Sequence, residues 1–192
     1  DRGLVGSEMC IRDRPGTIHH YKASNVIDFA WAADPDFIEE AVDVDGVTLR
    51  LIHQANAEID SNWTVLADYA AQAMAYMNED IGPYMYPEYT VIQGGDGGME
   101  YPMITLITGE RSLRSLVGVT VHEMAHSWFQ AMVATNESLH EWMDEGFTSW
   151  AESRCMAHLF ADPMKPSKDP HGWAYTSYIR QHLSGNEEPL IT

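Results

Sequence analysis

Two histidines, His122 and His126, are the residues of this chain whose types and spacing best suit a metal ion. Residues four apart on an α-helix lie on one face, so both imidazoles can point at the same ion. Glu145 follows in the segment Trp142–Gly146 and offers a third ligand. Two neutral imidazoles and one carboxylate leave a tetrahedral zinc ion with one open position for water. The sequence therefore predicts a Zn²⁺ site formed by His122, His126 and Glu145, with a single ion per chain.

Glu123 stands directly after the first histidine, in the pattern His-Glu-x-x-His. On a helix it is rotated by about a quarter turn from His122, which places its carboxylate beside the metal without making it a ligand. A carboxylate there can accept a proton from the water that attacks a carbonyl group. Taken alone, the pattern also fits two partly buried histidines on a core helix; the later acidic ligand and an upstream motif weigh against that reading. The pattern thus predicts hydrolysis, with Glu123 as the general base.

The chain is strongly acidic, with 29 Asp and Glu residues against 11 Lys and Arg residues. Because phosphate binding requires clustered Lys and Arg, this balance argues against a nucleic acid partner. No run of about eighteen apolar residues is present, so the sequence predicts no membrane span. Solubility is the simplest interpretation of the acidity, and attraction of the positive amino end of peptides is a second one.

The order of the expected elements, strands first and helices later, is typical of an α+β domain. The 192 residues suffice for one domain with a hydrophobic core. Asp45-Gly46 predicts a hairpin turn inside a β-rich segment. We expect strands over 42–52, 89–93 and 103–108, a glycine-rich loop over 94–98, and helices over 63–81, 113–134, 142–160 and 172–183.

Upstream of the histidines, the segment Gly97-Gly98-Met99-Glu100 adds a third motif. With these motifs in this order, the sequence resembles the zinc aminopeptidases of the aminopeptidase N family, which are gluzincin metallopeptidases. Those enzymes carry a Gly-x-Met-Glu-Asn segment before the zinc helix. The resemblance covers most of residues 17–192. It implies a thermolysin-like metallopeptidase catalytic domain, a small mixed sheet plus helices, preceded by the tail of an N-terminal β domain.

The resemblance also implies that Glu100 binds the free α-amino group of a peptide substrate. A carboxylate close to the metal can pair with an ammonium and fix where the peptide begins. Gly97 and Gly98 would let the backbone approach the substrate and hydrogen-bond to it. Tyr101 stands where the family often has Asn, so we expect the amine contact to be kept and the first substrate pocket to differ in shape.

The domain organisation follows from the motifs and from the unusual start of the chain. Residues 1–14 resemble read-through of a sequencing adapter and are predicted to be non-native. Residues 15–35 are interpreted as the end of an N-terminal β domain. Residues 36–192 are interpreted as the thermolysin-like catalytic domain, truncated at its C-terminus.

Four side chains outside the motifs also receive an interpretation. The family's oxyanion-stabilising tyrosine lies well beyond the third ligand, and Tyr175 and Tyr178 are too close to Glu145 to be that residue. We therefore expect it in the missing C-terminal part, so the fragment would lack one donor for the developing negative charge. Glu152, on the same helix face as Glu145, could orient a metal-bound imidazole; a solvated surface acid is the alternative. Cys155 is expected to be buried.

The leading hypothesis is a zinc-dependent aminopeptidase that acts on peptides with a free N-terminus. Two alternatives remain open: a zinc endopeptidase on the same fold, and an inactive zinc-holding binding domain that results from the truncation. The sequence predicts no oligomeric state. A bacterial periplasmic or secreted location is compatible with it.

Overall fold

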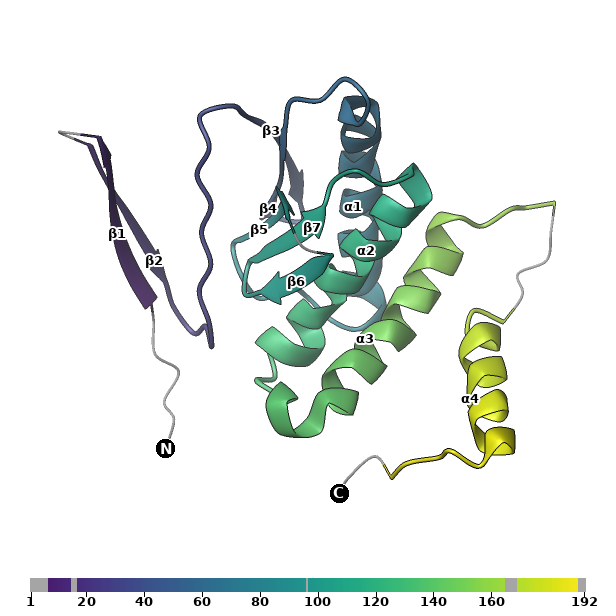
Figure 1. Ribbon diagram of the computed structural model, residues 1–192. Coiled ribbons are helices and arrows are strands. Elements are labelled where there is room, and N and C mark those ends of the chain that lie inside the picture. The colour runs from purple at the N-terminus through teal and green to yellow at the C-terminus, as the bar shows by residue number, and fades with distance from the viewer. Residues whose placement is uncertain (1–6, 15–16, 96, 165–168, 190–192) are drawn as a thin grey trace.

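The computed structural model describes residues 7–14, 17–95, 97–164 and 169–189. Figure 1 shows a five-stranded sheet with helices packed against it, and a separate two-stranded sheet near the N-terminus. The last helix in chain order, α4 (Gly172–Ser184), lies near the C-terminus in Figure 1. The expected α+β class is therefore confirmed.

The two-stranded sheet is formed by the start of the described chain. β1 (Ser7–Arg14) pairs antiparallel with β2 (Thr17–Ala23). Residues 1–6 lie outside the described residues. The interpretation of residues 1–14 as non-native stays a prediction.

The five-stranded sheet has the strand order β3-β4-β5-β7-β6. Its first two strands form the hairpin predicted at Asp45-Gly46. Both turn residues have positive φ, 54° and 86°, as a two-residue type I′ turn requires. The next pairs are parallel, and the last strand runs antiparallel at the edge. The strands are β3 (Phe37–Val44), β4 (Val47–Gln54), β5 (Glu88–Gly94), β6 (Gly98–Tyr101) and β7 (Ile104–Thr108).

One face of the sheet packs against α1 (Asp60–Asp80) and α2 (Leu113–His126). Every second side chain of β4 is buried, as expected for a strand with one covered face. The core between the layers holds α2, and with it both histidines, in a fixed position against the sheet. Its fully buried members include Leu49, Leu51, Val91 and Ile107 from the sheet and Trp63, Leu66, Met74, Met77, Leu116 and Met124 from the helices.

The expected helix over 113–134 is interrupted directly after its second histidine. α2 ends at His126, and a π-helical turn, η1, follows over Ser127–Ala131. π turns of this kind occur frequently at functional sites. The spacing of apolar residues carries no signal of this change of helix type, so the sequence pattern did not predict it.

The last two helices agree with expectation in type. α3 spans Glu137–Leu159 and begins before the expected start at residue 142. It is kinked at His140 (φ −137°, ψ 50°), so the regular helix resumes close to the expected position. α4 spans Gly172–Ser184 and is followed by Gly185, whose φ of 71° is the left-handed cap conformation that favours glycine.

The glycine-rich segment expected as a loop over 94–98 is shorter than predicted. β5 extends to Gly94, and the edge strand β6 already begins at Gly98. β6 was not predicted as a strand. It pairs with β7 and runs beside α2, as Figure 1 shows. Among the described residues, no helix is both long and apolar enough to cross a bilayer.

Candidate metal centre

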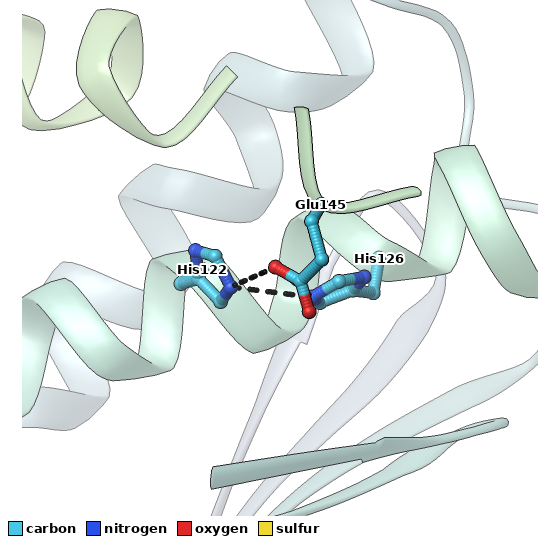
Figure 2. Close-up of side chains that lie close together, drawn as sticks. All are labelled: His122, His126 and Glu145. Atoms are coloured by element: carbon cyan, nitrogen blue, oxygen red, sulfur yellow. Dashed lines mark hydrogen bonds and ion pairs between the residues drawn. The ribbon is translucent and has the colours of Figure 1, made fainter. Parts of the chain in front are cut away.

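The three predicted ligands lie together. His122 and His126 occupy consecutive turns of α2, and Glu145 reaches them from α3 (Figure 2). The Nε2 atoms of the histidines are 3.2 Å apart. Oε2 of Glu145 lies 3.3 Å from Nε2 of His122 and 3.8 Å from Nε2 of His126. Two ligand atoms of one tetrahedral zinc ion lie about 3.4 Å apart, given zinc–ligand bonds of about 2.0–2.2 Å. The spacing of the three side chains therefore fits a zinc ion.

A carboxylate stands behind each histidine. Nδ1 of His122 is 3.1 Å from Oε2 of Glu152, and Nδ1 of His126 is 2.6 Å from Oδ1 of Asp144. Because an ionised carboxylate only accepts hydrogen bonds, these contacts place the imidazole proton on Nδ1. The Nε2 lone pairs are then directed toward the metal position, which is the arrangement of metal-binding histidines in proteins. The chemistry of the donor set thus agrees with its spacing.

The same carboxylates control the protonation of the metal-free histidines. Burial lowers the pKa of His122, but the hydrogen bond with Glu152 and the negative charges of Glu123, Glu152 and Glu145 together outweigh it, so the pKa lies above its usual value. Burial likewise lowers the pKa of His126, and the hydrogen bond and charge of Asp144 together with the charge of Glu100 more than compensate, again with a net rise. Protons and a metal ion would therefore compete for both imidazoles.

Glu123 is buried beside the candidate ligands, with 7% of its surface exposed. Burial raises its pKa to about 7, with His122 and His126 acting in the opposite direction. A carboxyl group with a pKa near neutrality can both accept and return a proton at neutral pH, which suits a general base.

Gly98 is the reason that the Glu123 carboxylate can occupy this position. A Cβ atom added at Gly98 would lie 2.0 Å from Oε1 of Glu123, far closer than any real contact. The edge strand β6 therefore passes directly over the carboxylate only because position 98 has no side chain. This is a structural reason for the glycine, in addition to the substrate approach suggested by the sequence.

Glu100, two residues further along β6, lies near the same centre. Its carboxylate and the side chains of Glu123 and His126 have ligand atoms within 4.8 Å of one another. Gly97 is exposed at the start of this segment, and its carbonyl accepts a hydrogen bond from Nη2 of Arg111 at 3.1 Å. All seven predicted site residues are thus gathered around the junction of β6, α2 and α3.

Sequence reasoning missed several side chains that complete this junction. Asp144 directly precedes a predicted ligand, and its position could have been noticed for that reason. Arg111 contacts Gly97, 14 residues earlier in the chain, and Gln130 contacts Glu137 from the unpredicted π turn. Neither has a local sequence signal, because each contact forms only in the folded chain. Cys155, in contrast, is fully buried as expected.

Comparison with known proteins assigns the chain to a family. The family described as "Peptidase family M1 domain" matches residues 65–191. Aminopeptidase B of Rattus norvegicus is 36% identical over 121 residues, which cover 57% of this chain and 18% of that protein. Leucine aminopeptidase 2 of Ajellomyces capsulatus is 30% identical over 135 residues, covering 67% of this chain and 22% of that protein. The chain thus spans about a fifth of the length of these relatives.

Solved structures show the same fold. An M1 zinc metallopeptidase from Deinococcus radiodurans superimposes with a TM-score of 0.65 at 20% identity, and the match covers 98% of this chain and 43% of that one. A mutant of the Deinococcus enzyme bound to a Tyr-Ser-Ala substrate gives a TM-score of 0.60 at 18% identity, covering 97% and 44% of the two chains. These likenesses agree with the thermolysin-like fold that the sequence resemblance implied. Because the family match spans most of the chain, including every candidate site residue, this protein belongs to peptidase family M1.

Proposed function

We propose that this chain carries the catalytic centre of a zinc-dependent aminopeptidase. The observation that carries the proposal is the cluster of His122, His126 and Glu145, with Glu123 buried beside it, in a chain of the M1 family. The catalytic domain is proposed to span residues 36–192. The curated relatives named aminopeptidases support the reaction class.

His122, His126 and Glu145 would hold the zinc ion. Such an ion would act as a Lewis acid that polarises a peptide carbonyl and lowers the pKa of a bound water molecule. Glu123 would accept the proton of the attacking water and pass it to the leaving amine. Burial keeps this carboxylate out of bulk water, and the absence of a side chain at Gly98 leaves room for it.

Glu100 would bind the α-ammonium of the substrate. In an amino acid, one Cα separates the α-nitrogen from the carbonyl carbon, so an amine anchor for an exopeptidase must lie close to the general base. The proximity of the Glu100 and Glu123 side chains satisfies this requirement. Gly97 and Gly98 would present backbone groups to the bound peptide. The expected product is one N-terminal residue per cleavage.

The test is hydrolysis of an amino-acid p-nitroanilide by the zinc-loaded chain, alongside its N-acetylated form. Glu123→Gln should lower kcat by roughly 10²–10⁴-fold, the usual contribution of a general base, while zinc content stays unchanged. Glu141→Gln, an exposed glutamate of α3 outside the centre, is the matched control.

The outcomes separate the proposal from its two alternatives. Equal cleavage of free and N-acetylated substrates would support a zinc endopeptidase. One zinc ion bound without hydrolysis, in this chain and in a longer chain that includes it, would support the zinc-holding binding domain and contradict the enzyme assignment.

A further inference from the structure

A second group of carboxylates lies next to the proposed amine anchor. Glu100 from β6, Glu137 from the first turn of α3 and Asp144 each contribute an oxygen, and these atoms lie within 4.8 Å of one another. Asp144 is already engaged by His126 at 2.6 Å. Glu100 and Glu137 are half-buried, and among the described residues no Lys or Arg is recorded within ion-pair distance of either. Two neighbouring carboxylates without a cation repel each other.

Gln130 supplies an independent observation beside this group. It is 4% exposed, and its Nε2 donates a hydrogen bond to Oε2 of Glu137 at 3.1 Å. Its Oε1 is buried and has no hydrogen-bond partner among the described residues. Buried side-chain oxygens rarely remain without a donor, so this oxygen is available to accept a further hydrogen bond.

The spacing along the helix accounts for the position of Gln130. His122, His126 and Gln130 follow one another at intervals of four residues, so all three lie on nearly the same side of the helix. η1 begins directly after His126 and contains Gln130 among its buried residues. The amide therefore lies one turn beyond the second candidate metal ligand, beside the start of α3.

The three groups together accept hydrogen bonds and carry negative charge. A primary ammonium offers three N–H donors, no acceptor and one positive charge, which matches two carboxylates and one amide oxygen. A hard divalent cation such as Ca²⁺ would need six to eight oxygen ligands, more than this group leaves free. We propose, on the basis of the proposed function, that Glu137 and Gln130 join Glu100 in binding the α-ammonium of the substrate, as substrate-binding residues that the sequence did not indicate.

The experiment measures amine binding without turnover. The zinc-loaded, ¹⁵N-labelled full chain is titrated with L-alaninol, a primary amine that cannot be hydrolysed, and with N-acetyl-L-alaninol. The side-chain amide signals of Gln130 report on the pocket directly in NMR spectra. We expect L-alaninol to shift these signals with a saturable dependence on its concentration, and the acetylated compound to leave them unchanged.

Variants then assign the contacts. Glu137→Gln should weaken L-alaninol binding roughly ten- to hundredfold, the usual effect of losing a charge-assisted hydrogen bond. Gln130→Met keeps the side-chain volume but removes the carbonyl, and should weaken binding several-fold. Binding to this variant is followed on the backbone amide signal of Glu100. It also serves as the second variant if Glu137→Gln does not fold. Glu141→Gln should bind like the wild type.

The result that overturns the inference is distinct from failure of the proposed function. Loss of binding in Glu100→Gln together with wild-type binding in Glu137→Gln and Gln130→Met would leave Glu100 as the sole anchor and contradict the inference. Absence of L-alaninol binding to the wild type, or signal shifts with Ca²⁺ alone, would also contradict it. Specific amine binding in a chain that never hydrolyses peptides would support the pocket and contradict the proposed function.

Discussion

Replacing Gly98 by alanine should separate activity from stability, because the new methyl group would collide with a single flexible side chain. The added Cβ would lie 2.0 Å from Oε1, 2.7 Å from Cδ and 3.3 Å from Cγ of Glu123. Real Cβ contacts essentially never fall below 3.0 Å, so the oxygen must move by about 1 Å. The carboxyl group must move and Cγ must give by a few tenths of an ångström, which rotation about the side-chain bonds can provide.

The cost in folding free energy should therefore be small, and the cost in rate large. Overpacking of a rigid core costs about 1–3 kcal/mol, and a side chain that can rotate should bring the cost to the lower end, about 1 kcal/mol. A catalytic group displaced by about 1 Å can lose about 10²-fold in rate. We expect kcat for an amino-acid p-nitroanilide to fall by about 10²-fold in Gly98→Ala, with zinc affinity unchanged because no candidate ligand is touched.

Gly95→Ala is the matched control for this substitution, because this exposed glycine has no assigned role in the centre. Its added Cβ would meet no atom within 4 Å. Urea denaturation would give the stability of both variants, and a chelator competition would give their zinc affinity. Gly98→Ala activity within about threefold of Gly95→Ala would refute the reasoning about the Glu123 carboxylate.

Three further predictions concern the surroundings of the centre. Asp144→Asn and Glu152→Gln should each lower zinc affinity by about 10–100-fold in chelator competition, because they remove the acceptors that orient the histidines. Burial raises the pKa of Cys155 to about 12, so with the other cysteine replaced by serine, iodoacetamide at pH 8 should label the denatured but not the native protein. Trp128→Phe should lower the free energy of unfolding by about 1–3 kcal/mol in urea titrations, because Nε1 of this buried indole donates a 2.7 Å hydrogen bond to the carbonyl of Gly82.

The sequence predicted those parts of the fold that depend on local chemistry. The Asp45-Gly46 turn needs two residues that tolerate positive φ, and these residue types reveal it directly. The spacing of His122 and His126 likewise requires only one helical turn. Glu145 could be matched to them because the resemblance supplied the expected separation along the chain.

The remaining parts depend on contacts between distant segments. β6 consists of four residues and becomes a strand only by pairing with β7, so its own sequence carries little signal. The π turn after His126 is compatible with the same apolar spacing as an ordinary helix. Glu137 lies between the helices expected over 113–134 and 142–160, and the amide of Gln130 meets its carboxylate only after this turn and the start of α3 have formed.

The centre depends on how α3 packs against α2. α2 supplies both histidines, whereas α3 supplies Glu145 and also Asp144, the carboxylate behind His126. Ala151 and Cys155, further along α3, are buried in the core that holds the two helices together. A zinc ion bound by residues of both helices would favour the packed arrangement over any state in which they separate, because metal-binding free energy adds to the free energy of folding. Metal affinity and the packing of α3 are therefore linked, and a substitution that loosens either one should weaken the other.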